Sequence, residues 1–302
     1  MDDARIEAIV QAVLAELGKE TSAPRPSAAP APAPTSPPAG DLVIDLPDPT
    51  RPEARRALGV AQPFNAEGLR NLCATTTARL GVGRAGPRPK TRSLLLFQAD
   101  HGVTQDAIYS EVAEEVKARF QLFTVQTQVQ DRGQYLLRPD LGRKLSDEAR
   151  RTINERCAKG PQVQIVIGDG LSAAAVANNL AQIYPVIEQG LKAAGIRTGT
   201  PFFVRFARVG VINDINEIVG ADLVLLLIGE RPGLGVADAL SAYMGYRPGP
   251  GKTDAHRDVI CMITNNGGIN PLEAGAYVVE LIKKTLEFQA SGVELKLKTA
   301  GK

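Results

Sequence analysis

Four short apolar runs, separated by stretches with the spacing of helices, constrain the fold of this chain more than any other feature of its sequence. Val, Ile, Leu and Phe dominate these runs, which span residues 163–167, 202–206, 223–228 and 259–263. The stretches between them predict helices at 172–184 with 186–194, at 213–219 and at 237–243. Strands that are apolar along their whole length are buried on both faces, as in parallel sheets. We therefore expect an α/β fold with a Rossmann-like, mainly parallel sheet flanked by helices, and ligands at the carboxyl ends of its strands.

Helical patterns precede and follow this sheet. Segments near 63–80 and 103–119 predict a mainly helical portion at 42–150, ahead of a Rossmann-like domain at 151–302. The final helix has well-marked boundaries: Asn270 can cap its N-terminus, Pro271 suits its first position, and Gly292 lies beyond its end. We expect this helix to pack on the sheet.

The beginning of the chain divides into a helix and a linker. Within residues 1–20, the apolar side chains form one stripe at helical spacing, made of Ile6, Ile9, Val10, Val13, Leu14 and Leu17. Residues 21–41 are rich in Ala, Pro, Ser and Thr, which predicts a disordered, extended linker. An amphipathic helix on such a tether resembles the encapsulation peptides that dock enzymes to bacterial microcompartment shell proteins. The alternative is a helix that packs on its own domain or on a partner subunit.

The charge and cysteine content exclude several classes of protein. Thirty-five Lys and Arg against 33 Asp and Glu give a net charge of +2, and no long basic run offers a nucleic-acid surface. The acidic start differs from a secretory signal, and the longest apolar run, 223–228, is too short to span a bilayer. Three scattered cysteines and two histidines lack the spacing of a metal site. We expect a cytoplasmic protein with no metal, nucleic-acid or membrane partner.

Four glycine-rich loops next to apolar segments predict ligand-facing turns, because glycine lets the backbone approach a ligand closely or adopt positive φ. They span residues 81–89, 168–172, 229–235 and 265–268. One of them, Gly168-x-Gly170-x-x-Ala173, also fits a loose dinucleotide-binding pattern. The acidic residue about twenty positions on, Glu188, falls in a predicted helix and not at a strand end. A nucleotide-dependent oxidoreductase is therefore a minor alternative.

Groups able to perform catalysis are sparse in this sequence. Asp254-x-His256-x-x-Val259 approaches the Asp-x-His-x-x-Gly signature with which some cobalamin enzymes replace the base of the cofactor by histidine. The final glycine is missing and the motif precedes a strand, so we expect His256 to be a surface residue. No Ser/His/Asp set, carboxylate pair or cysteine with a base surrounds the glycine-rich loops. We predict no catalytic residue in this chain, and a purely structural assembly subunit is a second alternative.

Seven segments, taken in order, resemble the small (light) subunit of ethanolamine ammonia-lyase. The two most specific are Gly199-Thr200-Pro201-Phe202-Phe203-Val204-Arg205 and Gly229-Glu230-Arg231-Pro232-Gly233-Leu234-Gly235; the others are 83–89, 100–101, 138–143, 169–172 and 271–276. The resemblance covers about residues 50 to 295. It implies an adenosylcobalamin-dependent radical enzyme that converts ethanolamine to acetaldehyde and ammonia. It also implies a TIM-barrel large subunit as partner, a hexamer of heterodimers, and a base-on cofactor between the two subunits.

The resemblance further implies three cofactor contacts in this chain. Two carry over to Val209 and Glu230, which follow predicted strands. The third is a cysteine in the last strand of the family. It corresponds to Val259 when aligned without gaps from Arg257, and to Cys261 when aligned on the cysteine. Both residues are kept as candidates.

Overall fold

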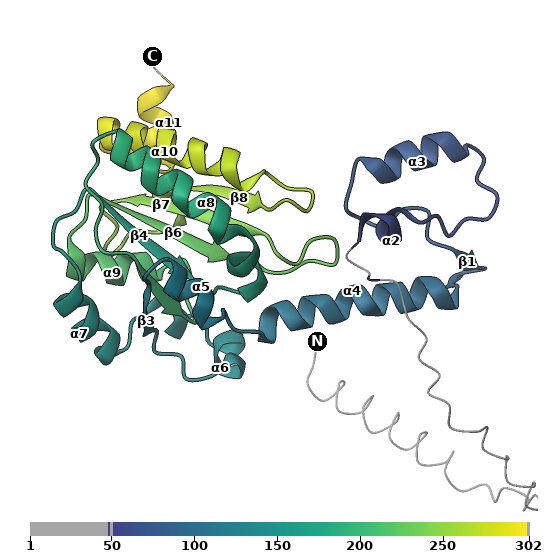
Figure 1. Cartoon of the computed structure of the whole chain (residues 1–302), viewed down its shortest axis with the longest axis horizontal. Helices are drawn as coiled ribbons and strands as arrows, with labels where there is room; N and C mark the ends of the chain where they lie inside the picture. The colour runs from purple at the N-terminus through teal and green to yellow at the C-terminus, as the bar shows by residue number, and fades with distance from the viewer. Residues whose placement is uncertain (1–47, 49–50, 301–302) are drawn as a thin grey trace, which may run out of the picture. The chain divides into compact units, whose positions relative to one another are not determined.

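A six-stranded sheet is the centre of the computed structural model, which describes residue 48 and residues 51–300 (Figure 1). In spatial order its strands are β3 (Phe123–Gln126), β5 (Phe202–Arg205), β4 (Val163–Gly168), β6 (Leu223–Gly229), β7 (Leu240–Tyr246) and β8 (Arg257–Ile263). Neighbours from β3 to β6 are parallel, whereas β6–β7 and β7–β8 are antiparallel. The sheet is therefore mixed: four of its six strands, from β3 to β6, are parallel as expected, and β7 and β8 add an antiparallel edge.

Helices cover both faces of the sheet. On one face pack α5 (Glu114–Arg119), α8 (Ala173–Ala193) and α10 (Pro271–Phe288); on the other pack α7 (Asp147–Arg156) and α9 (Val211–Val219). Strand β6 shows why the apolar runs are continuous: Leu225 and Leu227 belong to the first core, while Val224 and Leu226 belong to the second. Successive side chains of a strand point to opposite faces, so a strand between two helical layers must be apolar at every position.

The remaining elements precede the sheet, connect its strands or follow its last strand. They are α2 (Pro52–Arg56), α3 (Ala66–Ala74), the hairpin of β1 (Arg84–Ala85) and β2 (Arg88–Pro89), α4 (Thr91–Tyr109), α6 (Arg132–Leu137), η1 (Leu141–Arg143), η2 (Asp254–His256) and α11 (Val293–Thr299). None of the helices within residues 51–300 has the length and apolar content needed to span a membrane. The predicted helix at 1–20 and linker at 21–41 lie outside the described residues.

A buried carboxylate in α4 connects segments of the N-terminal part of the described chain, and one of its arginine partners also contacts the loop after β6. Asp100 of α4 is 3% exposed, and its two oxygens accept hydrogen bonds from Arg79 Nε and Nη2 at 2.6 and 3.0 Å. Arg55 of α2 lies 3.5 Å from the same carboxylate and also donates to the Leu234 carbonyl at 3.0 Å. This cluster ties α2, α4 and the loop after β6 together.

The four predicted strands and most predicted helices are confirmed, with the following corrections. The segment 237–243, predicted as a helix, contains the start of β7; although Ala, Leu and Met favour helices, β7 is buried between two strands that pair with it. The helical segment predicted near 103–119 is divided between α4 and α5, and residues 110–113 lie outside both helices. The mainly helical portion 42–150 also contributes β3, which pairs with β5 and was not predicted. The two helical stretches predicted around Pro185 form one helix, α8.

The last helix begins as predicted. Asn270 Oδ1 accepts a hydrogen bond from Leu272 N at 2.9 Å, and Pro271 is the first residue of α10. The helix ends at Phe288, after which Gln289 takes a left-handed conformation, and Gly292 is the residue directly before α11.

Candidate functional site

A cavity of about 320 Å³ lies where β4, β5 and β6 end. It brings together three of the four predicted site residues: Val209 after β5, Glu230 after β6 and Cys261 on β8. Val259 is 45% exposed but does not line this cavity. The other lining residues come from the same strand ends, from α6 and from β7: Tyr135, Gly170, Leu171, Ala207, Arg208, Ile228, Gly229, Arg231, Ser241 and Tyr243. The geometry therefore singles out Cys261 over Val259 as the β8 residue that faces the cavity.

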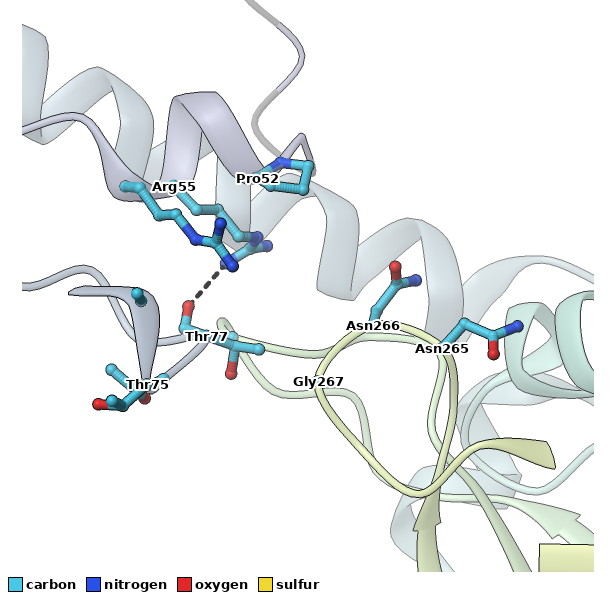
Figure 2. Close-up of a pocket in the computed structure, with 11 residues that line it drawn as sticks. Pro52, Arg55, Thr75, Thr77, Asn265, Asn266 and Gly267 are labelled. Carbon is cyan, nitrogen blue, oxygen red and sulfur yellow. Dashed lines mark hydrogen bonds between the residues drawn. The ribbon is translucent and has the colours of Figure 1, made fainter. Parts of the chain in front are cut away.

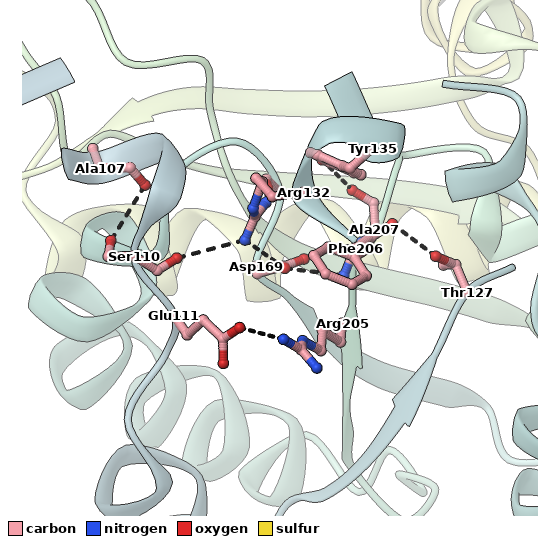
Figure 3. Close-up of polar contacts among 11 residues, drawn as sticks. Ala107, Ser110, Glu111, Thr127, Arg132, Tyr135, Asp169, Arg205, Phe206 and Ala207 are labelled. Carbon is pink, nitrogen blue, oxygen red and sulfur yellow. Dashed lines mark hydrogen bonds and ion pairs between the residues drawn. The ribbon is translucent and has the colours of Figure 1, made fainter. Parts of the chain in front are cut away.

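The turn that carries Val209 is held by a buried aspartate. Asp169, 2% exposed, follows β4, and its two oxygens accept hydrogen bonds from Phe206 N at 2.9 Å and Ala207 N at 3.0 Å (Figure 3). Arg132 Nη2 lies 3.3 Å from the same carboxylate. Burial raises the pKa of Asp169, and the two N–H groups and Arg132 oppose that shift. Since both oxygens accept from donors, the ionised carboxylate matches its surroundings.

The carbonyl groups of the same turn are also held by side chains. Tyr135 Oη donates to the Ala207 carbonyl at 2.7 Å, and Thr127 Oγ1 donates to the Phe206 carbonyl at 3.0 Å (Figure 3). Phe206 has a φ of 58°, a left-handed conformation that is unfavourable for an aromatic residue. Burial raises the pKa of Tyr135, so its hydroxyl stays a neutral donor. Two N–H groups and two carbonyls are thus fixed, and the turn holds a strained shape that directs the chain toward Val209.

Glu230 links the end of β6 to the edge strand β8. Its Oε1 accepts hydrogen bonds from Ser241 Oγ and from Met262 N, both at 2.6 Å. Met262 has a φ of 56°, and the pairing of β7 with β8 shifts register between Leu240 and Ala242. No hydrogen bond to Oε2 occurs within the described part of the chain. One oxygen therefore fixes the sheet edge next to Cys261, and the other is available to accept from a ligand.

Two of the four glycine-rich loops meet at the cavity because their backbones touch. A Cβ on Gly170 would overlap the Gly229 carbonyl oxygen, and one on Gly229 would overlap the Ser172 carbonyl oxygen. Ser172 Oγ accepts from Ala175 N at 3.1 Å and so caps α8. The glycines of the loose dinucleotide pattern therefore allow close packing of the backbone. The N-terminal N–H groups of α8, which would bind a phosphate in a dinucleotide site, already have a side-chain acceptor in Ser172.

The other two glycine-rich loops lie elsewhere. Asn265, Asn266 and Gly267 line a separate pocket of about 240 Å³ with residues of α2 and the turn at 74–77 (Figure 2). The loop at 81–89 contains the small β1–β2 hairpin. Of the four glycine-rich loops that were expected to face a ligand, two line this cavity, at 168–172 and 229–235.

His256 does not line the cavity, and the described residues contain no cluster of metal ligands. His256 lies in η2, and its Nδ1 accepts from Thr253 N at 3.0 Å, which completes a capping box ahead of β8. No group of three or more His, Cys, Asp and Glu suited to a metal ion occurs among residues 48 and 51–300.

Sequence comparisons agree on one family. The profile described as ethanolamine ammonia-lyase light chain matches residues 66–296. This chain belongs to the ethanolamine ammonia-lyase small-subunit family. Small subunits of ethanolamine ammonia-lyase from Clostridium perfringens and Listeria monocytogenes are each 45% identical over 251 residues, which covers 83% of this chain and 85% of each relative. The small subunit from Listeria innocua is 41% identical over 300 residues, which covers 98% of this chain and all of that relative.

Sequence reasoning missed the residues that hold the small-subunit cavity in shape. Asp169 stands in a glycine-rich loop and in a segment that resembles the family, but neither pattern predicts its buried contacts, and no pattern singles out Arg132, Tyr135 or Ser241. The available signal was an aspartate directly after a strand that is apolar throughout, a position where a carboxylate must find donors because it is buried.

Proposed function

We propose that this chain is the cofactor-holding subunit of an adenosylcobalamin-dependent ethanolamine ammonia-lyase, which converts ethanolamine to acetaldehyde and ammonia. Family membership supports the reaction, and the cavity that gathers Val209, Glu230 and Cys261 supports the role of the chain. We propose further that the cofactor binds base-on, between this chain and a TIM-barrel large subunit.

The cavity suits the edge or face of a large, amide-bearing ring. Leu171, Val209 and Ile228 offer apolar contact, while Glu230 Oε2 can accept from the N–H of a peripheral amide. When bound, adenosylcobalamin supplies a weak cobalt–carbon bond whose homolysis yields a radical. The residues of this chain hold the cofactor and keep water from it, since exclusion of water protects a reactive intermediate.

The polar groups at the cavity are engaged in holding the fold. One oxygen of Glu230 binds Ser241 and Met262, and burial, with the charge of Glu230, raises the pKa of Tyr243. A neutral phenol and a hydrogen-bonded carboxylate make poor partners for moving protons to and from a substrate. We therefore propose that the substrate-reacting groups belong to the large subunit.

Exposed apolar side chains in the N-terminal part of the described chain support docking to a partner. They lie on α3, on α4 and in the segment between α2 and α3: Phe64, Leu72, Leu94, Leu95, Phe97 and Tyr109. Each is more than 40% exposed, with Phe64 fully so. Several exposed large apolar side chains in one part of a chain are typical of surfaces that a partner covers. We propose that the large subunit covers it, in a hexamer of heterodimers.

For the residues that the structure does not describe, the proposal follows the sequence. A helix at 1–20 on a linker at 21–41 fits a cytoplasmic enzyme that is directed to a bacterial microcompartment through its shell proteins. The alternative is a helix that packs against a subunit.

Co-expression with and without the large subunit tests whether this chain holds the cofactor while the large subunit carries the groups that react with the substrate. The heteromer is expected to bind adenosylcobalamin, visible by its absorption bands, and to release ammonia from ethanolamine, whereas this chain alone is expected to release none. Turnover by the isolated chain would contradict the proposal. NAD binding in place of cobalamin would favour the oxidoreductase alternative, and a heteromer whose cobalamin affinity does not depend on this chain would favour a structural subunit.

Glu230 provides the sharper test of the cavity. In the heteromer, Glu230→Ala is expected to weaken cobalamin affinity by roughly ten- to a hundredfold, the loss of one charge-assisted hydrogen bond. Glu230→Gln keeps one acceptor for Ser241 and Met262 but replaces Oε2 by an N–H donor, so it is expected to lose affinity while its thermal melt stays close to that of the wild type. Because Glu230→Ala also frees β8, thermal melts without cofactor accompany the titration. Unchanged affinity in both variants would remove Glu230 from the cofactor site.

A further inference from the structure

A second, larger groove continues from the cavity. Its volume is about 710 Å³, and it shares Arg208, Val209 and Tyr243 with the cavity that Glu230 lines. From the shared residues it extends over η1, the start of α9 and the loop that precedes η2. Its lining is rich in basic side chains: Arg143, Lys144, Arg208, Lys252 and Arg257.

Two arginines of the groove are fixed by a reciprocal packing of two loops. A Cβ on Gly142 would lie 2.6 Å from Arg208 Cγ, and a Cβ on Gly210 would lie 3.0 Å from Arg143 Cγ. Each loop thus presents a glycine on which the arginine of the other loop lies. The contact is reinforced where Arg208 N donates to the Gly142 carbonyl at 2.8 Å. Arginine stems held in this way lose little further freedom when a ligand binds.

The positive charge of the groove is not balanced by its own carboxylates. Asp254 pairs with Arg257, and Glu217 lies 3.5 Å from Arg150. A third carboxylate, Asp214, lies 3.7 Å from Lys144 and 2.6 Å from Arg150.

Three cations are left over after these pairings. Arg143 and Lys252 have no ion-pair partner within the described residues, and Arg208 contacts only the ring and the carbonyl of Tyr135 through its guanidinium. The Nε of Arg208 is buried without a hydrogen-bond acceptor in the same part of the chain. These three cations leave the groove with a net positive charge, which attracts an anion.

We propose that Arg143, Arg208 and Lys252 bind the phosphodiester of the nucleotide loop of cobalamin. The inference rests on the proposed function, and it adds an anion subsite to the cofactor cavity. Cobalamin carries neutral amides around its ring and one phosphodiester in the chain that leads to its lower base. The carboxylate of Glu230 attracts amide N–H groups and repels the phosphodiester. The basic groove attracts the phosphodiester and offers N–H donors, which amide N–H groups cannot use. The two ends of the continuous groove therefore fix one orientation of the cofactor.

Adenosylcobinamide, which lacks the phosphodiester and the lower base, separates this subsite from the rest of the site. In the heteromer, the double variant Arg143→Gln, Lys252→Gln is expected to lose about tenfold or more in affinity for adenosylcobalamin and to bind adenosylcobinamide as the wild type does. The loss should shrink at high ionic strength. Arg138→Gln is the matched control, because Arg138 pairs with Asp140 at the surface and does not line the groove.

Three results would overturn the subsite. One is an equal loss of affinity for both ligands in the double variant, and another is unchanged affinity for both. The third is binding of inorganic phosphate, measured by calorimetry, to a heteromer already saturated with cobalamin, which would assign the groove to a free phosphate. Failure of the wild-type heteromer to bind either corrinoid would instead contradict the proposed function itself.

Discussion

Replacing Asp169 by Asn should loosen the turn that carries Val209. The carboxylate accepts from two backbone N–H groups, Phe206 N at 2.9 Å and Ala207 N at 3.0 Å, and lies beside Arg132. An asparagine side chain has one oxygen, so it can accept from one of these groups and presents its own N–H donors to the other. One buried N–H is then left without an acceptor and Arg132 loses its counter-charge, although Arg132 keeps a hydrogen bond to the Gly170 carbonyl at 3.2 Å.

The cost follows from these contacts. Loss of one hydrogen bond to a charged group, with a buried donor left unsatisfied, costs about 1.5–3 kcal/mol, and the weakened pairing of Arg132 adds to it. We expect Asp169→Asn to lower the free energy of unfolding by about 2–4 kcal/mol and the melting temperature by roughly 5–15 °C. Cobalamin affinity of the heteromer should fall with it, because binding must then order the turn.

Thermal and urea unfolding of the heteromer measure the first effect, and a cobalamin titration measures the second. Asp222→Asn is the matched control, since Asp222 forms an exposed pair with Arg247 at 2.8 Å and should cost less than about 1 kcal/mol. If both variants have the same melting temperature and urea midpoint as the wild type, Asp169 does not hold the turn. If Asp169→Asn melts early but binds cobalamin as tightly as the wild type, the turn does not shape the cofactor site.

Three further expectations concern other parts of the chain. Asp100→Asn should lower the free energy of unfolding by about 3–5 kcal/mol, because Arg55 and Arg79 lose a buried counter-charge; a urea melt like that of Asp222→Asn would contradict this. Iodoacetamide at pH 8 should alkylate exposed Cys261 first, and bound cobalamin should protect Cys261 from the reagent. Burial raises the pKa of Cys157 to about 11, so Cys157 stays an unreactive thiol at this pH. Mass spectrometry that finds Cys157 alkylated as fast as Cys261 would refute this. Deletion of residues 1–38 should leave ethanolamine turnover intact, and loss of subunit assembly in the truncated enzyme would indicate a packing helix.

The central parallel strands β4, β5 and β6 were predictable because they are buried on both faces. β4 and β6 contain only buried residues, so their apolar runs stand out from the rest of the sequence. β3 alternates buried and exposed positions over four residues at the sheet edge, which is too short a pattern to distinguish from its surroundings. β7 contains Leu240, Ala242 and Met244, which also suit a helix, and its conformation is decided by pairing with β6 and β8.

The site was predictable only in part, for a related reason. Val209, Glu230 and Cys261 came from the family resemblance, and the structure brings them to one cavity. The partners of Asp169 could not be inferred, since the N–H groups that it accepts from lie 37 and 38 residues later and reach it through the pairing of β4 with β5. Likewise, the contact of Glu230 with Met262 spans 32 residues and depends on the unpredicted strand β7.

The contact between Glu230 and Met262 also has a consequence for biosynthesis. Strand β8 supplies both Cys261 and the N–H group that Glu230 accepts, and it is the last strand of the sheet to leave the ribosome. A nascent chain that has released β3 to β6 can form the parallel half of the sheet, but its cavity still lacks one wall and Glu230 has no backbone donor from β8. Under the proposed function, the cofactor can therefore bind in this cavity only after the C-terminal strands have been synthesised.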